Sequence, residues 1–403
     1  MTAPWWGAAG ALPDLSPPRT ADVVIVGGGI LGLATAYHLA RQGAHPLLLE
    51  RDGLGAGATG RNGGFLPIGT ADDYDATIVR LGRPAARELL GLTLENRQLA
   101  DEILGVEEIA CDFRPVGHLH LALSPTEHNG NRRLAELLTE DGCRTAHLDR
   151  AQAQSMVATP FGATVGGGLF FRDIGLLHPG KLVAGLAAAA RRRGAVIARA
   201  EVQRIEGSER GARIITDRGN IDAGAVLTAV NAWTGELRPA LAPLITPVRG
   251  QVVAFAPVAP LFRAGMTALT TATEEYWQQL PDGSIILGGC RAVRPERDEG
   301  VLSLSPTADV QGALDQVLAA LFPEIGSLEA THRWAGPMAF TRDLLPIVAP
   351  WPEAAGWSIG GFSGNGMSLS LILGQLIGDV LLGRPADPRL SLFRPNRFSG
   401  AVP

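Results

Sequence analysis

Hydrophobic and polar positions near the start of the chain predict a strand, a glycine turn, a helix and a second strand. Residues 22–26 read Asp-Val-Val-Ile-Val, an apolar run typical of a buried parallel strand. The run leads directly into Gly27-Gly-Gly29-Ile-Leu-Gly32, and apolar residues at helical spacing follow. A second apolar strand, at residues 45–49, ends on Glu50. This order predicts a βαβ unit whose first turn is built from glycine.

Patterns farther along the chain predict both helices and strands. Apolar residues recur at helical spacing within residues 78–104. Helices are also predicted at residues 124–140, 178–193, 305–322 and 364–382, and strands at residues 116–123, 195–205, 213–217, 224–230, 248–255 and 357–360. Pro281-Asp282-Gly283 between two strand-like runs, residues 275–280 and 284–288, is typical of a hairpin. The order predicts an α/β (α+β) fold in which one sheet domain interrupts another.

Length and composition allow a large core and exclude several kinds of partner. The chain has 403 residues, of which 46% are hydrophobic and 19% charged, with a net charge of −5. Basic stretches are short and interrupted by acids, so no nucleic-acid-binding surface is expected. Residues 1–20, with four prolines and the pair Trp5-Trp6, predict an extended arm lying on the folded body.

The cysteines and the apolar segments indicate the cellular compartment of the protein. Cys111, Cys143 and Cys290 are odd in number and widely spaced, which predicts neither a disulfide framework nor a metal site. The N-terminus has no basic region before an apolar run, unlike a secretory signal. Residues 367–382 are apolar but shorter than the about 20 residues of a membrane span. We therefore expect a cytoplasmic protein without a membrane span.

The first glycine turn has the chemistry of a dinucleotide-binding site. Gly27 permits the tight turn, Gly29 lets a diphosphate approach backbone N–H groups, and Gly32 lets helix and strand pack closely. The helix N-terminus supplies partial positive charge, and Glu50 can accept both ribose hydroxyls. The alternative is a glycine-rich loop that only starts an ordinary helix.

Two further glycine-rich loops carry candidate cofactor contacts. Residues 360–367 read Gly-Gly-Phe-Ser-Gly-Asn-Gly-Met between a predicted strand and a long helix, which predicts a second anion-binding helix N-terminus. Residues 53–64 contain six glycines and end in Gly60-Arg61-Asn62-Gly63-Gly64. Arg61 could neutralise a phosphate or approach a flavin. The alternatives are a turn that serves only packing and a surface arginine.

Taken with these loops, several motifs make the sequence similar to one enzyme family. They are Val24–Leu33, Glu50, Gly57–Gly64, Asn231-Ala-Trp233, Arg249-Gly-Gln251, Trp334-Ala-Gly336 and Gly361–Gly366. The chain resembles the FAD-dependent D-amino-acid-oxidase-like family, which includes glycine, sarcosine and γ-glutamylputrescine oxidases. The tandem N-terminal aromatics, Gly-Arg-Asn-Gly-Gly and Asn-Ala-Trp look most similar to the γ-glutamylputrescine oxidase branch.

The resemblance implies a Rossmann-like FAD-binding domain interleaved with an antiparallel-sheet substrate domain. The FAD-binding domain would comprise residues 1–95, 150–240 and 332–403, and the substrate domain residues 96–149 and 241–331. Val202 would meet the adenine through its backbone. The motifs and the resemblance together give these cofactor-binding residues: Gly27, Gly29, Ile30, Leu31, Gly32, Glu50, Arg51, Ala58, Thr59, Arg61, Asn62, Gly63, Gly64, Val202, Gly336, Gly364, Asn365, Gly366 and Met367.

The reaction that the resemblance implies is oxidation of the C–N bond of an amine or amino acid. Hydride would pass from the carbon beside the nitrogen to flavin N5, the imine would hydrolyse, and O₂ would be reduced to H₂O₂. Tyr276, Met338 and Asn365 are the candidate catalytic residues. Tyr276 and Trp277 would face opposite sides of a strand, and His332 and Phe340 are further candidates beside the ring.

Departures from the family pattern affect the cofactor linkage and the substrate. Met338 stands where glycine oxidases carry a carboxylate-binding arginine and sarcosine oxidases a flavin-linked cysteine, so we expect non-covalent FAD. Binding the carboxylate of a simple α-amino acid would then require another arginine, such as Arg291 or Arg342. The lysine that activates O₂ in sarcosine oxidases has no evident match, since Lys181 falls on a predicted cofactor-domain helix.

Three readings of the function therefore stay open at the level of sequence. The first is an amine or amino-acid oxidase, and the second is a dehydrogenase with a quinone or protein electron acceptor. The third is a flavin-binding protein without turnover. The sequence leaves the substrate, its stereochemistry and the oligomeric state undetermined.

Overall fold

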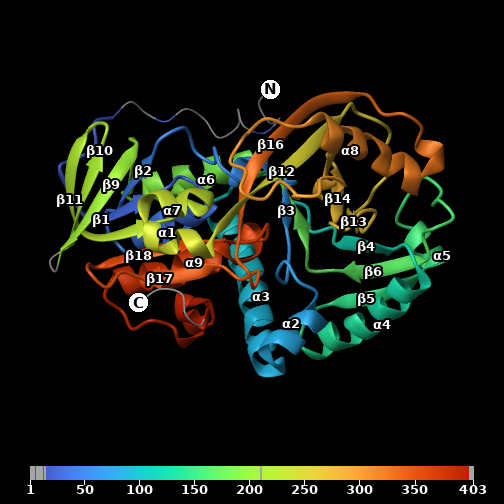
Figure 1. Cartoon of the computed structure of the whole chain (residues 1–403), viewed down its shortest axis with the longest axis horizontal. Helices are drawn as coiled ribbons and strands as arrows, with labels where there is room; N and C mark the ends of the chain where they lie inside the picture. The colour runs from blue at the N-terminus through green and yellow to red at the C-terminus, as the bar shows by residue number, and fades with distance from the viewer. Residues whose placement is uncertain (1–4, 6–11, 13–14, 209–210, 399–403) are drawn as a thin grey trace.

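The structure, a computed structural model, describes residues 5, 12, 15–208 and 211–398 and has two sheet-containing halves (Figure 1). The sheet of the first half has the order β17 (Ile347–Pro350), β18 (Gly356–Gly360), β11 (Gly219–Thr228), β1 (Thr20–Val26), β2 (Leu47–Glu50) and β8 (Val196–Arg199). The pairs from β18 to β8 are parallel, and β17 runs antiparallel at the edge. β9 (Val202–Ser208) and β10 (Gly211–Thr216) extend β11 as an antiparallel hairpin.

The strands of this parallel sheet are apolar on both faces, so each face packs against a core, and helices cover one of the two faces. Val23 and Ile25 of β1 point to a core shared with α1 (Ile30–Arg41), α6 (Pro179–Arg192) and α9 (Gly366–Leu381), while Val24 and Val26 point to a second core on the other face. α1 and α9 approach closely, since a Cβ on Gly374 would lie 2.9 Å from Ala34 Cβ. The N-termini of α1 and α9 are thereby held on the same side of the sheet.

The second half is built on a largely antiparallel sheet. Its order is β16 (Ala330–Phe340), β12 (Thr246–Phe255), β15 (Ile285–Gly288), β14 (Glu275–Gln279), β13 (Gly265–Ala268), β4 (His118–Ala122), β6 (Gly167–Phe171) and β5 (Thr145–Asp149). Only the pair β13–β4 is parallel within the described residues. α8 (Ala308–Leu321) packs on one face over Phe255, Trp277 and Phe322. The predicted hairpin is confirmed as β14 and β15.

The remaining helices lie in different parts of the molecule. α3 (Arg83–Val106) runs through the middle of the molecule, with α2 (Tyr74–Leu81) at its N-terminal end (Figure 1). α4 (Pro125–Glu140) is capped by the Ser124 side chain, and α5 (Arg150–Gln154) and α7 (Thr234–Leu237) are short. β3 (Phe65–Leu66) pairs with β7 (Gly175–Leu176) between the two sheets.

Two elements differ from the sequence prediction. The helix predicted over residues 78–104 is interrupted at Gly82, whose φ of 78° is left-handed, and α3 then begins with a proline in its first turn. The strand predicted over residues 195–205 is two strands, because Ala200 and Glu201 leave the parallel sheet before β9 begins. The mixed α/β architecture itself is as predicted.

Two strands of the second sheet fall within segments that the sequence analysis expected in the first domain. β6 and β16 belong to the second sheet, and β6 and most of β16 fall within residues 150–240 and 332–403, which were expected in the first domain. Both segments cross between the halves, so the chain passes from one sheet to the other within each of them (Figure 1).

Trp5 and most of the apolar C-terminal segment are buried. Most of residues 1–14, including Trp6, lie outside the described residues, but Trp5 is buried against Trp334 and His178, with ring centroids 6.4 and 5.2 Å away. The apolar segment at residues 367–382 lies within α9, whose residues are mostly buried in the core. Among the described helices, none has the length and apolar character needed to cross a membrane.

Candidate active site

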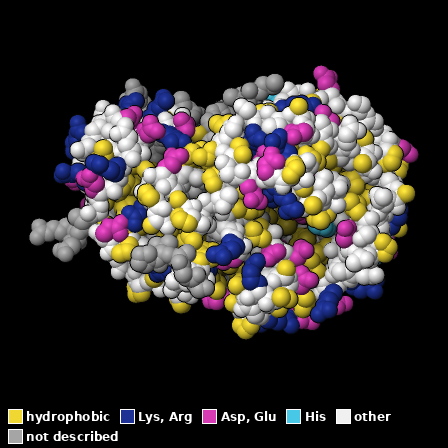
Figure 2. Space-filling view, viewed as in Figure 1, with side chains coloured by type: hydrophobic (Ala, Val, Ile, Leu, Met, Phe, Trp, Pro, Cys, Tyr) yellow, Lys and Arg dark blue, Asp and Glu magenta, His cyan; other side chains and the backbone are white. Residues whose placement is uncertain are grey.

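A cavity of about 910 Å³ opens between the two halves. Its walls come from β1, α1 and α9 of the first half, from β12, β14 and β16 of the second, and from the glycine-rich loop after β2. The face shown in Figure 2 is hollowed between the halves, with hydrophobic side chains inside the hollow. Both glycine-rich helix starts predicted from the sequence line this same cavity.

The N-terminus of α1 presents uncapped N–H groups to the cavity. Gly28 N donates to Glu50 Oε2 at 2.7 Å, and Ile30 N donates to Thr59 Oγ1 at 3.2 Å. For the N–H groups of Gly29 and Leu31 no partner exists within the described residues, and the first turn holds neither a capping side chain nor an acid. An anion such as a diphosphate would satisfy these donors and the positive end of the helix.

Glu50 is held at the end of β2 by backbone donors. Its Oε1 accepts from Asp52 N at 2.9 Å and Gly53 N at 3.3 Å, in addition to the bond from Gly28. A carboxylate has about four lone-pair positions, so Glu50 can still accept a hydroxyl. Arg51 beside it lies 5.1 Å over the Trp233 ring, and Val202 lines the same end of the cavity.

The glycine-rich loop is tied to the second half by Arg61. The Arg61 guanidinium donates to Ala56 O at 2.9 Å and to Ala335 O at 3.1 Å, and Trp334 Nε1 donates to Arg61 O at 2.9 Å. Burial lowers the pKa of Arg61. Arg61 lines the cavity as expected, but these bonds to carbonyl groups join the loop to β16. Ala58, Asn62 and Gly63 line the cavity beside it.

Two of the predicted cofactor-binding glycines lie behind the cavity wall instead of lining it. A Cβ on Gly32 would lie 2.0 Å from Gly27 O, so this glycine permits close packing of α1 on the preceding turn, the role predicted for it. A Cβ on Gly64 would lie 2.4 Å from both Gln278 Nε2 and Leu177 O, which places Gly64 in the contact between the loop and β14. Neither glycine is among the residues that line the cavity.

The second glycine-rich turn brings the N-terminus of α9 to the same space. Ser363 and Gly364 have φ values of 51° and 87°, which turn the chain from β18 into the helix. Asn365 is the N-cap residue without a side-chain cap bond, and the N–H groups of Gly366 and Met367 have no partner within the described residues. Two uncapped helix N-termini from distant parts of the sequence therefore face one cavity.

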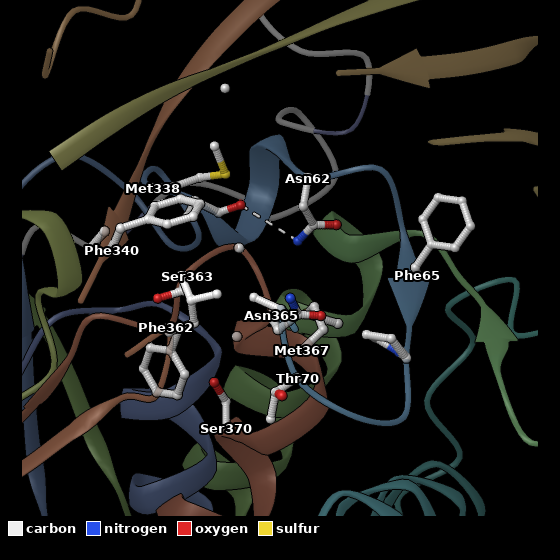
Figure 3. A pocket seen from close by; sticks show the side chains of 18 of the residues that line it. Asn62, Phe65, Thr70, Met338, Phe340, Phe362, Ser363, Asn365, Met367 and Ser370 are labelled. Atoms are coloured by element: carbon white, nitrogen blue, oxygen red, sulfur yellow. Dashed lines mark hydrogen bonds between the residues drawn. The ribbon is translucent and has the colours of Figure 1, made fainter. Parts of the chain in front are cut away.

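Side chains from the second half close the cavity opposite α9. In Figure 3, Met338 and Phe340 lie on one side, Phe65 lies on the other, and Asn365 and Met367 lie between them. Tyr276 packs against Phe65, with ring centroids 5.8 Å apart, and Gly336 lines the wall beside Met338. The three candidate catalytic residues Tyr276, Met338 and Asn365 therefore share this part of the cavity.

Of the other candidate residues, one lines the cavity and three do not. Trp277 is fully buried in the core under α8, so it faces away from Tyr276 as the strand alternation predicts. His332 is exposed on β16 and does not line the cavity. Of the two arginines, Arg291 lines the cavity and Arg342 does not.

A comparison with known families identifies the group to which the chain belongs. The family described as DAO, FAD dependent oxidoreductase, matches residues 22–380. The chain belongs to this family. It is 27% identical to a probable oxidoreductase OrdL of Rhizobium meliloti, over 93% of this chain and 86% of the relative. It is 28% identical to γ-glutamylputrescine oxidoreductase of Escherichia coli, over 92% of this chain and 85% of the relative.

Solved structures of DAO-like architecture agree with the fold. Glycine oxidase from Geobacillus kaustophilus superposes with a TM-score of 0.80 at 24% identity, covering 95% of this chain and all of the other. L-Proline dehydrogenase from P. horikoshii superposes with a TM-score of 0.79 at 22% identity, covering 96% of this chain and all of the other. At these sequence identities, the similarity shows a shared fold and no more.

The residues of this DAO-family protein fit its FAD cofactor. FAD carries a diphosphate, a ribose and a ring whose pyrimidine edge gains negative charge on reduction. The cavity offers unpaired N–H groups at α1, a carboxylate with accepting capacity at Glu50, and a second uncapped helix N-terminus at α9. A Cβ on Gly29 would enter the cavity and meet only Thr59 Oγ1, at 3.2 Å.

The cavity of the DAO-family protein continues past Phe65 into a polar region that sequence reasoning missed. His118 Nε2 lies 2.9 Å from Thr267 Oγ1, and His120 Nδ1 lies 3.2 Å from the same oxygen and 3.3 Å from Glu274 Oε1. Burial lowers the pKa of His118 to about 4. Burial also lowers the pKa of His120, but the bond and charge of Glu274 outweigh it, so the pKa is raised.

A signal for part of this region was present in the sequence. His118 and His120 alternate with leucine on a predicted strand, so both point to one face. The pattern does not say that this face borders the cavity, because Phe65 and Thr267 come from distant segments. Phe65 itself follows Gly63-Gly64 directly and could have been considered with that loop.

Proposed function

We propose that the protein is an FAD-dependent oxidase that converts the C–N bond of an amine or amino acid to an imine, with O₂ as electron acceptor. The observation that carries the proposal is the meeting of two uncapped helix N-termini, those of α1 and α9, around one cavity. Membership of an FAD-dependent family supports the cofactor. When bound, FAD would supply the hydride acceptor for the substrate carbon and the route of electrons to the acceptor.

The cavity residues then have distinct tasks around the cofactor. The N–H groups of Gly29 and Leu31 bind the diphosphate, and Glu50 accepts the ribose hydroxyls. The N-terminus of α9 stabilises negative charge at the pyrimidine edge of the ring. Tyr276, Met338 and Phe340 enclose the substrate carbon and exclude water, which favours the neutral amine that can donate hydride.

We further propose that FAD is bound without a covalent link. Cys111, Cys143 and Cys290 are buried thiols and none of them lines the cavity. Met338 lies in the wall where the resemblance would place a flavin-linked cysteine. The three unpaired cysteines also suit a reducing compartment, so we propose a cytoplasmic location. The half with the parallel sheet would be the FAD-binding domain, and the half with the antiparallel sheet the substrate domain.

For the electron acceptor, a specific observation favours an alternative to O₂. Lys181, the chain's only lysine, lies on α6 and pairs with Asp112 at 2.7 Å, away from the cavity. A cation beside the ring therefore has to be an arginine or a protonated histidine. This observation favours, as a second candidate, a dehydrogenase that passes electrons to a quinone or a protein. A flavoprotein without turnover is the third candidate.

One experiment with the purified holoprotein separates the three. Amines and amino acids are added without O₂, and loss of the flavin absorbance near 450 nm identifies substrates; air is then admitted and H₂O₂ is measured. Reduction by an amine and one H₂O₂ per substrate support the oxidase. Fast reduction with slow reoxidation by O₂ but fast reoxidation by a quinone would show a dehydrogenase. No reduction by any amine would contradict both enzymes.

A further inference from the structure

Beyond Phe65, the part of the cavity that lies away from Met338 is acidic (Figure 3). Its lining comes from residues 67–77, from β4 and α4, and from residues 267–274, and we call it the acidic pocket. Carboxylates outnumber basic groups in this lining: Asp72, Asp73, Asp75, Glu127 and Glu274 against His118 and His120. No arginine or lysine among the described residues lines the acidic pocket.

The carboxylate of Asp73 is not engaged by the protein. Asp73 precedes α2, a position from which an aspartate commonly caps a helix, but its side chain accepts no bond from the first turn. Within the described residues this carboxylate makes neither a hydrogen bond nor an ion pair. The side chain is exposed to the cavity, yet burial among the surrounding residues raises its pKa. A cation bound beside it would offset that cost.

A single imidazole faces two carboxylates in the acidic pocket. His120 Nδ1 lies 3.3 Å from Glu274 Oε1. Burial raises the pKa of Glu274, but the bond and charge of His120 outweigh it, so the pKa is lowered. The pKa of His120 is raised in turn, and the two side chains form an ion pair that is neutral as a whole. The negative charge of Asp73 is therefore left without a counter-ion of its own.

Two buried polar side chains in the acidic pocket have unused hydrogen-bonding capacity. Asn131 is 8% exposed and His118 7%, yet within the described residues Asn131 Nδ2 and His118 Nδ1 have no hydrogen-bond partner. Asn131 shares a face of α4 with Glu127 and Leu134, which also line the cavity, so its amide points into the pocket. An amide oxygen and the bare nitrogen of a neutral imidazole can both accept a hydrogen bond from an ammonium group.

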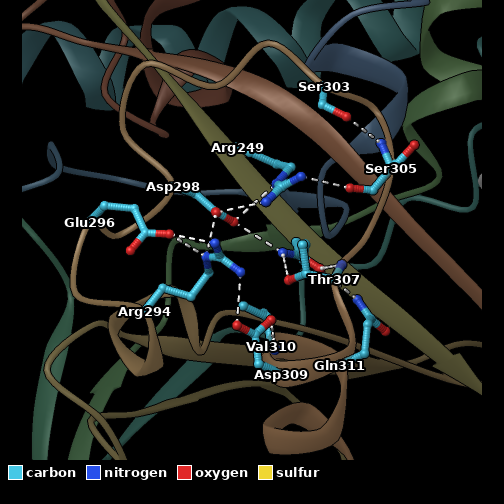
Figure 4. Close-up of polar contacts among 11 residues, drawn as sticks. Arg249, Arg294, Glu296, Asp298, Ser303, Ser305, Thr307, Asp309, Val310 and Gln311 are labelled. Atoms are coloured by element: carbon cyan, nitrogen blue, oxygen red, sulfur yellow. Dashed lines mark hydrogen bonds and ion pairs between the residues drawn. The ribbon is translucent and has the colours of Figure 1, made fainter.

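Nearby arginines of the second half do not neutralise the acidic pocket. Arg291 lies on the side of Phe340, with its guanidinium carbon 4.9 Å over that ring. Arg249 and Arg294 are bound to the buried carboxylate of Asp298, at 2.7 and 3.1 Å (Figure 4). Because that network satisfies both guanidinium groups, their charge is not available to the pocket.

An organic cation suits the acidic pocket better than a metal ion does. Within the described residues, no group of three or more histidine, cysteine, aspartate or glutamate side chains could hold a metal ion. An ammonium group has three N–H donors and needs only acceptors around it. Carboxylate, amide and imidazole groups supply such acceptors here.

The acidic pocket lies one short carbon chain away from the residues that enclose the substrate carbon. Phe65 packs against Tyr276 and His118, with ring centroids 5.8 and 5.5 Å away. Glu274 lies two residues before Tyr276, and both line the cavity; extended residues at this spacing share a face and lie about 7 Å apart. At about 1.2 Å per bond, an extended diaminohexane spans roughly 8–9 Å between its nitrogens. One molecule can therefore reach both places.

We propose that the acidic pocket binds an ammonium group at the far end of the amine substrate, with Asp73 as its counter-ion and Asn131 as a hydrogen-bond acceptor. The proposal rests on the proposed function and narrows its substrate class to diamines and longer polyamines with an amino group at each end. The reacting amine lies beside Tyr276 in its neutral form, while the far amine stays protonated. Glu274 adds a second carboxylate whose remaining lone pairs can accept from the same ammonium.

The binding test uses three ligands of similar length that differ in the far group. Diaminohexane ends in an ammonium, aminohexanol in a hydroxyl and ε-aminocaproate in a carboxylate. Each is titrated calorimetrically into holoprotein whose flavin has first been reduced, without O₂, so that no amine is oxidised. The proteins are wild type, Asp73→Asn, Asp73→Glu and the control Glu136→Gln. Glu136 is exposed on α4 and does not line the cavity, so the control removes one negative charge outside the pocket.

We expect wild type to bind diaminohexane about tenfold to hundredfold more tightly than aminohexanol, the range of a charge-assisted hydrogen bond, and ε-aminocaproate most weakly. Asp73→Asn should lose most of this preference and keep its affinity for aminohexanol, and it should fold because asparagine is also a good N-cap residue. Asp73→Glu should regain part of the preference, and Glu136→Gln should keep all of it. No preference in wild type, or the full preference in Asp73→Asn, would overturn the inference.

The role of Asn131 has its own readout. Asn131→Leu keeps most of the side-chain volume and removes the acceptor, so diaminohexane should bind several-fold more weakly while hexylamine binds as in wild type. The Tm of the free protein should not fall, because the change removes a buried amide without a partner. Wild-type affinity for diaminohexane in this variant, or an equal loss for both amines, would contradict the role of Asn131.

Flavin reduction separates this inference from the proposed function. With oxidised holoprotein and no O₂, Asp73→Asn should need roughly tenfold more diaminohexane for half its maximal reduction rate, and that maximal rate should match wild type. Tight binding of diaminohexane that depends on Asp73, without flavin reduction, would support the acidic pocket and contradict the amine oxidase. Flavin reduction by amines without any preference for diaminohexane would support the oxidase and overturn the pocket.

Discussion

Replacing Gly29 by alanine should separate cofactor binding from folding. Gly29 has a φ of −78° and ψ of −179°, a conformation that alanine adopts without strain. The added Cβ would meet only Thr59 Oγ1, at 3.2 Å, which a small movement of that side chain relieves. We therefore expect the free energy of unfolding of the apoprotein to change by less than about 1 kcal/mol.

The same methyl group should strongly weaken FAD binding. It projects into the cavity beside the N–H groups of Gly29 and Leu31, so the diphosphate can no longer approach both donors. Losing two charge-assisted hydrogen bonds at ~1.5–3 kcal/mol each gives ~3–6 kcal/mol. This corresponds to a rise in Kd of roughly a hundredfold to ten-thousandfold.

Gly32→Ala is the contrasting variant. A Cβ at this position would lie 2.0 Å from the carbonyl oxygen of Gly27, and a backbone atom cannot move aside cheaply. We expect this variant to unfold at a lower temperature as apoprotein, with a cost of about 1–3 kcal/mol or more. The pair therefore distinguishes a glycine that faces the cofactor from one that serves packing.

The assay compares apoproteins prepared in parallel. Kd is measured from quenching of FAD fluorescence, and stability from thermal unfolding followed by circular dichroism. Wild-type FAD affinity in Gly29→Ala would refute the assignment of the α1 N-terminus as the diphosphate site. An equally large loss of stability in both variants would show that the effect on FAD is an effect on folding.

Three further predictions concern packing and titration. Trp5→Ala should lower the Tm in thermal melts, because it removes a fully buried indole, a change of ~3–5 kcal/mol in a well-packed core; an unchanged Tm would show that the arm adds no stability. Glu274→Gln should lower the pKa of His120 in an NMR titration. Stability from a raised histidine pKa is complete below the unfolded value of about 6.5 and is lost as pH rises through the folded value, so the stability deficit of the variant should shrink as pH rises above about 6.5. Burial raises the pKa of Cys111 to about 11 and of Cys143 to about 12 and also raises that of Cys290, so a chromogenic disulfide reagent at pH 8 should label no thiol before denaturation and all three after it.

Local sequence patterns were sufficient to predict those elements whose structure depends on neighbouring residues alone. The strand, glycine turn and helix at residues 22–41 follow from apolar spacing and from the positions of Gly27, Gly29 and Gly32. The hairpin of β14 and β15 follows from its turn residues, and the alternation of Tyr276 and Trp277 from the pleat of a strand. The break at Gly82 could have been predicted as well, because a proline two residues later is a helix-start signal.

The composition of the cavity depends on contacts between segments that are distant in the sequence. Arg61 donates to Ala335, 274 residues away, so no local pattern could show that its guanidinium would join the loop to β16. His332 was a candidate by its place in the sequence, yet the register of β16 with β12 leaves it exposed. The same dependence applies to Arg291 and Arg342, between which the sequence could not choose.

By itself, then, the sequence determined the two glycine-rich helix starts, because backbone geometry and dipole direction are properties of neighbouring residues. Only the tertiary structure decided that both starts face one cavity and that Arg291, but not Arg342, lines it. The physical reason is that a cavity wall is a set of side chains from several elements. Its charge depends on which of those side chains already bind one another, as Arg249 and Asp298 do.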